Sequence, residues 1–317
     1  MYLSLTEIAM GVKTFYIFIN FHTVYRLHQM AISKQFQPIC EEELRPAQSL
    51  LSKVNFCFMA YFIWVFVTVA TAVPSFFDEK YELPFFTWVL GIPYGSDMPY
   101  NFYCLWIYQI SGLFMHGIFN VAAELQVGYL LTVARIQLDF LTRRFASLSR
   151  ANETSQHRES FIECVQHYTV VEKFVRDFEH VFSKPMFAQF CASGASICAT
   201  AYRLSSVNLS EDFSSVVTMT LYLLALMYQI FLQCYFGNEV TLKSEHLTHA
   251  LYSAGWYKLV PRLRKDIQMM MIRSQRPIKL KAGGYIYCNL KSFTSTLNLA
   301  YSVFCVLQRR KQSIRYD

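Results

Sequence analysis

Long apolar blocks alternate with charge-rich stretches along the chain, and each block is close to the length of a membrane-crossing helix. Such a helix needs about 20 mostly apolar residues to cross the ~30 Å hydrocarbon core of a bilayer. The pattern predicts an all-α polytopic membrane protein with six spans in this chain. The expected spans are residues 5–25, 54–74, 101–132, 185–204, 213–237 and 285–308.

Apolar residues at helical spacing also continue into the charged stretches. They do so over residues 134–148, 159–182 and 259–272. An apolar stripe on an otherwise charged helix needs a protein partner, so these segments predict helices that extend beyond the bilayer. We expect the Gly283-Gly284 pair to break the chain between such an extension and the last span.

The last span combines a mainly apolar surface with one neutral polar stripe. The stripe recurs every three or four residues, which places it on one helical face. Its members are Thr294, Asn298, Ser302 and Cys305. A polar stripe on a membrane helix either lines water or packs against protein. Water lining predicts a channel, and an interhelical hydrogen-bond seam is the alternative.

Composition supports the membrane class. Aromatic residues make up 17% of the chain and charged residues only 16%, whereas an ordinary soluble domain has a charged share nearer a quarter. The histidines are scattered, and the cysteines show no spacing typical of metal ligands. We therefore expect no enzyme, no metal and no other cofactor.

Lys and Arg gather in the stretches after the first, third and fifth spans, whereas the alternate connections are mainly acidic. Basic loops stay in the cytosol, so the visible ends of this chain are expected outside. The glycosylation sequon at Asn208 falls in an outside loop and is the expected acceptor. The sequon at Asn152 falls in the most basic loop and is read as a chance match. The net charge of +7 is thus an orientation signal and gives no reason to expect nucleic acid as a partner.

The first apolar block begins almost directly after Met1, with no cationic segment or cleavage site of a signal peptide. Translocation of such an end is difficult. We therefore expect a cytosolic N-terminus and one further span upstream, which gives seven spans in the complete protein. A genuine six-span protein is the alternative.

The C-terminal third resembles the insect odorant receptor family in the order and spacing of its residues. The matching positions are Trp256, Arg264-Lys265, residues 272–277, Ala282-Gly283, Phe293, Tyr301-Ser302 and Leu307-Gln308. A fainter match covers residues 99–109 and Glu124. The resemblance spans the whole chain and implies a seven-span, odorant-gated, weakly selective cation channel subunit. It also implies a heterotetramer with the olfactory co-receptor in the plasma membrane of sensory neurons.

Three other kinds of membrane protein are alternatives to a ligand-tuned odorant receptor. Insect gustatory receptors favour a Thr-Tyr to Gln-Phe motif in the last span, and Ala300-Tyr301 with Gln308-Arg309 does not meet it. The co-receptor itself carries a longer cytosolic insertion than residues 135–184. A secondary transporter usually shows two related halves with broken helices, and none are visible. A ligand-tuned odorant receptor subunit is therefore the preferred interpretation.

The resemblance implies three sets of functional residues. A volatile odorant needs an apolar, sparsely polar pocket, and the family places it in the outer half of the bundle. The corresponding candidates are Met10, Thr14, Ile17, Trp64, Thr68, Gln109, Leu113, His116, Thr218 and Tyr222. The pore candidates are Asn298, Ser302, Cys305 and Gln308, where Arg309 departs from the apolar residue usual at the mouth. The subunit-anchor candidates are Trp256, Arg264 and Arg273.

The expected organisation follows from these assignments. Residues 1–237 form the helical bundle with the odorant pocket, and residues 238–284 form the cytosolic anchor. Residues 285–308 form the pore-lining span, and residues 309–317 a short extracellular tail. The basic stretch 262–281 holds subunits together or, alternatively, is attracted to anionic membrane lipid.

Overall fold

The computed structural model describes residues 2–72, 99–147, 154–205 and 213–316. Within these ranges the chain is helical apart from one two-stranded hairpin. The elements are α1 (Tyr2–Ile19), α2 (Phe21–Ile32), η1 (Lys34–Phe36), α3 (Glu41–Ala72), α4 (Pro99–Ser147), α5 (Thr154–Leu204), α6 (Phe213–Ser253), η4 (Trp256–Lys258), α7 (Pro261–Ser274), β1 (Lys281–Ala282), β2 (Ile286–Tyr287) and α8 (Leu290–Tyr316). The predicted all-α membrane architecture is confirmed.

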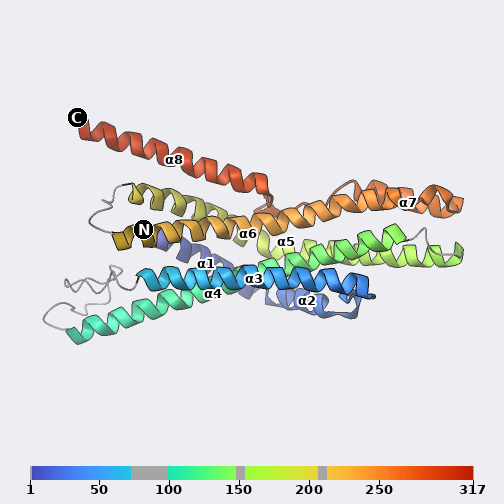
Figure 1. Cartoon of the computed structure of the whole chain (residues 1–317), viewed down its shortest axis with the longest axis horizontal. Coiled ribbons are helices and arrows are strands. Elements are labelled where there is room, and N and C mark those ends of the chain that lie inside the picture. Colours follow the sequence, from blue (N-terminus) through green and yellow to red (C-terminus); the bar gives the residue numbers. More distant parts are fainter. Residues whose placement is uncertain (1, 73–98, 148–153, 206–212, 317) are drawn as a thin grey trace.

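The helices of the bundle run along one long axis (Figure 1). Helices α2 and α7 lie toward the same end, which we call the α7 end, and α8 runs away from it along one side of the bundle (Figure 1). Among the described residues, three helices are long and apolar enough to cross a membrane by composition, and they are α3, α4 and α6. The other long helices carry buried polar side chains that other helices cover, such as Lys13 in α1 and Ser196 in α5.

The first expected span is not one helix. It is broken at Asn20, where α1 ends and α2 begins. The Asn20 side chain donates to the carbonyl of Tyr16 at 2.9 Å, and its own carbonyl accepts from the backbone N–H groups of Thr23 and Val24. Asparagine can bond the local backbone in this way, which competes with a continuous helix. The chain therefore changes direction inside the segment predicted as residues 5–25.

The remaining long helices continue past the expected span ends. Helix α4 joins the predicted segments 101–132 and 134–148, and α5 runs through Pro185 without interruption. Helix α6 extends to Ser253 and so crosses position 237, where we had placed the start of the anchor. These continuations are as expected for helices whose apolar faces remain covered by neighbouring helices beyond the bilayer.

A dense core fills the α7 end of the bundle. Phe174, Phe178 and Phe182 recur at four-residue spacing on α5 and expose 2% or less of their surface. The rings of Phe178 and Phe182 stack with centroids 4.8 Å apart. Leu138 of α4 and Leu247 of α6 are fully buried in the same core. Aromatic side chains of this size contribute strongly to core packing.

The glycine pair forms the turn of a small hairpin between α7 and α8. Gly283 and Gly284 have φ values of 61° and 79°, which favour residues without a Cβ. Lys281 pairs with Tyr287 in the antiparallel strands. The Ser183 hydroxyl of α5 donates to the Lys281 carbonyl at 2.6 Å, and the Gly283 N–H donates to the Ser183 carbonyl at 2.8 Å. The predicted break is confirmed, and α8 begins at Leu290 rather than at residue 285 and continues to Tyr316.

Candidate functional site

A cavity of about 90 Å³ lies between α1, α3, α4 and α6. These are the four helices expected to enclose the odorant pocket. Its lining residues are Thr6, Tyr61, Val65, Thr68, Val69, Leu113, His116, Gly117, Asn120, Tyr222, Ala225, Leu226 and Gln229. Most of them are apolar or aromatic, with a few amide and hydroxyl groups, which is typical of small-molecule sites. The cavity therefore has the character expected for a volatile ligand.

Four predicted pocket residues line this cavity together: Thr68, Leu113, His116 and Tyr222. The α1 candidates do not. Met10 is half-buried, Thr14 is exposed and donates to the Met10 carbonyl at 3.0 Å, and Ile17 packs against the core.

The other three predicted pocket residues also lie outside the cavity lining. The Trp64 indole N–H donates to the Leu221 carbonyl of α6 at 3.3 Å. The Thr218 hydroxyl donates to the Thr71 carbonyl of α3 at 3.2 Å, and Gln109 is buried on α4. Trp64 and Thr218 therefore join α3 to α6 beside the cavity lining.

The cavity residues that were not among the candidates lie within two helical turns of them. On α4 the face that carries Leu113 and His116 continues to Asn120, and on α6 the face of Tyr222 continues to Gln229. These additional residues continue the same faces at three- or four-residue intervals, farther from the helix ends than the candidates on α4 and α6. On α1 the cavity lies nearer the helix end than the candidates do, because Thr6 lines it and Met10 does not.

A buried polar cluster adjoins the cavity on its α7 side. The Lys13 ammonium of α1 forms an ion pair with Glu124 of α4, and both side chains are nearly inaccessible. The Gln229 amide donates to Glu124 Oε1 and to Asn120 Oδ1, each at 2.8 Å. The Gln233 amide donates to both Glu124 oxygens at 3.0 Å. A buried charge that loses its partner is strongly destabilising, so this cluster fixes α1, α4 and α6 relative to one another.

A second ionisable pair reaches the cavity wall. His116 Nδ1 lies 3.1 Å from Glu7 Oε2, and the Glu7 side chain is more than half exposed. His116 lines the cavity from α4, while Glu7 belongs to α1. This pair therefore joins the same two helices as Lys13 and Glu124, but at a more accessible position.

The predicted polar stripe lies on a face of α8 that the rest of the chain leaves open. Asn298, Ser302 and Gln308 are exposed and Cys305 is half-buried. The packed face instead carries residues that contact α5 and α6, among them Phe293, Leu297 and Ala300. The Ser302 hydroxyl donates to the Asn298 carbonyl at 2.9 Å, so its hydrogen is satisfied within the helix.

The anchor candidates make contacts within the chain at the α7 end. Trp256 packs against the core, and Arg264 donates to the Leu259 carbonyl at 2.7 Å. Arg273 of α7 forms an ion pair with Glu172 of α5 and lies 6.0 Å from the centroid of the Tyr168 ring. These contacts fix α7 and η4 to the bundle.

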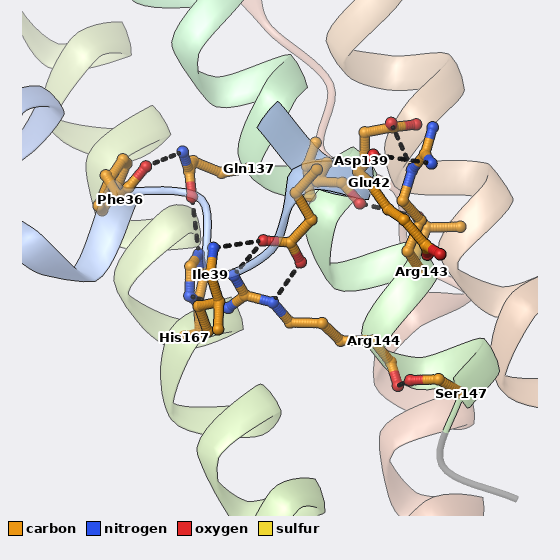
Figure 2. Close-up of polar contacts among 12 residues, drawn as sticks. Phe36, Ile39, Glu42, Gln137, Asp139, Arg143, Arg144, Ser147 and His167 are labelled. Carbon is orange, nitrogen blue, oxygen red and sulfur yellow. Dashed lines mark hydrogen bonds and ion pairs between the residues drawn. The ribbon is translucent and has the colours of Figure 1, made fainter. Parts of the chain in front are cut away.

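A larger cavity of about 640 Å³ lies at the α7 end, beside the connection from η1 to α3. Arg144 of α4 binds both carboxylate oxygens of Glu43 at 2.8 Å (Figure 2). His167 of α5 lies 3.4 Å from Arg144 Nη1 and 3.0 Å from the Gln137 carbonyl oxygen, and Gln137 donates to the Phe36 carbonyl (Figure 2). These bonds tie η1 and α3 to α4, and α4 to α5, so we assign this cluster to structure.

The protonation state of His167 follows from these contacts. Nδ1 faces the Arg144 guanidinium, which can only donate, so Nδ1 accepts and Nε2–H donates to Gln137. Burial, reinforced by the Arg144 charge, lowers the pKa of His167 to about 4 against the opposing effect of Glu43. The imidazole is therefore neutral at physiological pH.

Two further predictions concern single sites. The glycosylation candidate Asn208 lies outside the described residues. Within the part of the chain that the structure describes, no group of three or more His, Cys, Asp or Glu side chains is placed to hold a metal ion.

Comparison with known proteins gives related chains across almost the full length. The family model described as 7tm Odorant receptor matches residues 1–301. Odorant receptor 94a of Drosophila melanogaster is 24% identical over 97% of this chain and 79% of its own length. Odorant receptor 2a of Drosophila melanogaster is 28% identical over 78% of this chain, and the match spans 65% of that receptor.

A solved structure has the same fold. The insect olfactory receptor OR5 from Machilis hrabei in complex with eugenol superposes with a TM-score of 0.83 at 19% identity. The superposition covers 97% of this chain and 80% of that receptor. Because the family match covers nearly the whole chain, this chain belongs to the 7tm odorant receptor family.

Proposed function

We propose that this chain is the ligand-tuned subunit of an odorant-gated, weakly selective cation channel. It acts with the olfactory co-receptor as a heterotetramer in the plasma membrane of sensory neurons. One observation carries the proposal. A mainly apolar cavity with His116, Asn120 and Gln229 in its wall lies among α1, α3, α4 and α6 of an odorant receptor fold.

The exposed stripe of α8 supports the channel part of the proposal. Asn298 and Ser302 are uncharged and open to the surroundings of this chain. Repeated around a symmetric axis, such a stripe lines a path that lets hydrated cations pass without tight binding. The opposite face of α8, at Phe293 and Ala300, is covered by the bundle, so the helix has one face available for a pore.

The α7 end supports the proposed orientation and assembly. It carries the basic loops, and this supports a cytosolic position for the α7 end. Trp256, Arg264 and Arg273 keep α7 and η4 firmly attached to the bundle, and we assign the surface they stabilise to contacts between subunits. The loop that contains Asn208 then lies outside the cell.

The decisive experiment records odorant-evoked current from cells that express the full-length receptor with its co-receptor. In the variant Val65→Trp, the large ring fills the cavity that Val65 lines, so the current should be lost while surface expression is kept. Ile63→Trp is the matched control, because Ile63 lies on the same helix and is 56% exposed. Odorant responses that survive Val65→Trp unchanged would contradict the assignment of this cavity.

The pore assignment needs its own pair of variants. Ser302→Lys places a charge on the exposed stripe and should reduce cation current several-fold at normal surface expression, through repulsion of permeating cations. Ala300→Lys buries the same charge against the bundle and should abolish surface expression instead. Unaltered conductance and ion selectivity in Ser302→Lys would show that the stripe faces protein or lipid.

A further inference from the structure

The buried cluster beside the cavity has a fixed hydrogen-bond polarity. It begins at Lys13, whose ammonium can only donate, and continues to the Glu124 carboxylate, which can only accept while it is ionised. Both oxygens of Glu124 accept hydrogen bonds from neighbouring amides, so in this cluster the carboxylate is the acceptor and the groups around it are the donors. Every other side chain that meets Glu124 must therefore present a donor to it.

This requirement determines how the two glutamine amides point. Gln229 directs its NH₂ group at Glu124 Oε1, and the same nitrogen also donates to Asn120 Oδ1, each at 2.8 Å. Both hydrogens of Gln229 are thus engaged. The NH₂ group of Gln233 also donates to both Glu124 oxygens, so both glutamines turn their NH₂ groups toward the carboxylate.

The amide of Asn120 is oriented in turn. Its oxygen accepts from Gln229, so its NH₂ group is the part that remains for another partner. Among the described residues, no acceptor for that NH₂ group is observed, and Asn120 lines the cavity. If the Asn120 amide were reversed, its NH₂ group would face the NH₂ group of Gln229. Gln229 cannot reverse in response, because its NH₂ group is held by Glu124.

We propose that the chain Lys13–Glu124–Gln229–Asn120 presents a hydrogen-bond donor to the odorant. The receptor then selects small neutral odorants that carry an acceptor oxygen, such as ketones, aldehydes and esters, over hydrocarbons of the same shape. This inference rests on the proposed function, because it takes the cavity as the odorant site. Its new element is the class of ligand and the residue that distinguishes it.

Size and charge narrow the class further. A cavity of roughly 150 Å³ holds benzene, so in proportion the 90 Å³ found here fits a molecule of about four non-hydrogen atoms. The Glu124 carboxylate is already neutralised by Lys13, and no unpaired charge in the described cavity wall would compensate an ionic ligand. Burial of such an ion would be costly, so carboxylic acids and amines in their charged forms are excluded.

The test compares two odorants that differ only at the acceptor. Acetone carries the oxygen, and its isosteric alkene, isobutene, replaces that oxygen with a methylene group. In the full-length receptor with its co-receptor, the ketone should activate at a roughly tenfold lower concentration than the alkene, the factor of about one neutral hydrogen bond. In Asn120→Leu, which keeps the size of the side chain but removes the donor, the two concentrations should become equal.

Two further variants keep the result interpretable. Asn120→Ala removes the donor and enlarges the cavity, so it should also abolish the preference if the leucine variant does not reach the surface. Val65→Ala changes the cavity wall without touching a polar group, so it should shift both odorants and retain the preference.

The outcomes separate the inference from the proposed function. Equal sensitivity to ketone and alkene in the wild-type receptor, or a preference that persists in both Asn120 variants, overturns the inference alone. The cavity would then still be the odorant site if Val65→Trp abolishes responses. A receptor that ignores all small carbonyl compounds but responds to larger hydrocarbons overturns the inference too. Responses insensitive to every cavity variant overturn both.

Discussion

The two halves of α4 are both apolar, yet only the second half is packed inside the chain. Ile107 and Phe119 in the first half each expose 61% of their surface. In the second half, Leu130, Leu138 and Phe145 are fully buried. The first half therefore requires lipid or another chain as its surroundings, whereas the second half is covered by its own bundle.

The two ends of the bundle accordingly differ in how densely they are packed. The α7 end combines the aromatic core around Phe178 with the hydrogen-bonded cluster around Arg144, and it is expected to resist unfolding. The opposite end exposes large side chains. The candidate cavity lies at the inner limit of that end, near Asn120. Regions with few buried contacts open at lower free energy, which suits a site that must respond to a ligand.

The largest expected effect comes from the packed half. Phe178→Ala removes a ring that is 1% exposed and stacked on Phe182, so it should lower the free energy of unfolding by about 3–5 kcal/mol. Phe119→Ala makes the same change at a side chain that is 61% exposed, so the free energy of unfolding should change by less than about 0.5 kcal/mol. Thermal unfolding of the purified full-length receptor measures both. Similar losses in the two variants would contradict the contrast between the halves.

A smaller effect is expected from a pair of glycines. A Cβ at Gly237 of α6 would lie 2.5 Å from the carbonyl oxygen of Cys288, so the hairpin strand would have to move. Overpacking of this kind costs about 1–3 kcal/mol, and Gly237→Ala should destabilise by that amount. Gly112 of α4 has no such neighbour within 4 Å, so Gly112→Ala should be neutral or slightly stabilising. Thermal unfolding of both variants tests this prediction. Equal stability of Gly237→Ala and Gly112→Ala would mean that the hairpin does not pack on α6.

Helix periodicity predicted much of this fold. The span that became α3, the long α4 and the break at Gly283 follow from apolar spacing and from the conformational freedom of glycine. The interruption at Asn20 was missed, because hydropathy alone does not register a side chain that bonds its own backbone. The hairpin was missed because its strands are only two residues long.

The helices of the candidate pocket came from the family resemblance, and helical periodicity suggested a face on each. Leu113, His116 and Tyr222 line the cavity, whereas Met10, Gln109 and Thr218 do not. The depth depends on contacts between helices far apart in sequence. Lys13 lies within the predicted span 5–25, and its pairing with Glu124 fixes the position of α1, on which Thr6 lines the cavity.

The smallest effect concerns His167, whose contacts are drawn in Figure 2, and tests how far water reaches the α7 end. Burial first, and then the Arg144 charge, lowers the pKa of His167 from 6.5 to about 4. As pH falls below 6.5, the unfolded chain binds a proton at this histidine and the folded chain does not. With the full shift, the folded state would lose about 2 kcal/mol between pH 7 and pH 5. Solvent reaches the half-buried imidazole and screens this to about 1 kcal/mol, with the loss complete near pH 4.

Thermal unfolding of the purified receptor at pH 7 and pH 5 measures this loss. His167→Gln keeps a polar side chain but removes the titrating group, so it should reduce the difference between the two midpoints by about 2–4 °C. The exposed His249, changed to Gln in the same way, is the matched control. An unchanged difference in His167→Gln would mean that the imidazole is protonated in the folded state. Its bond from Arg144 would then be lost, and the α7 end would be more open to water than its burial indicates.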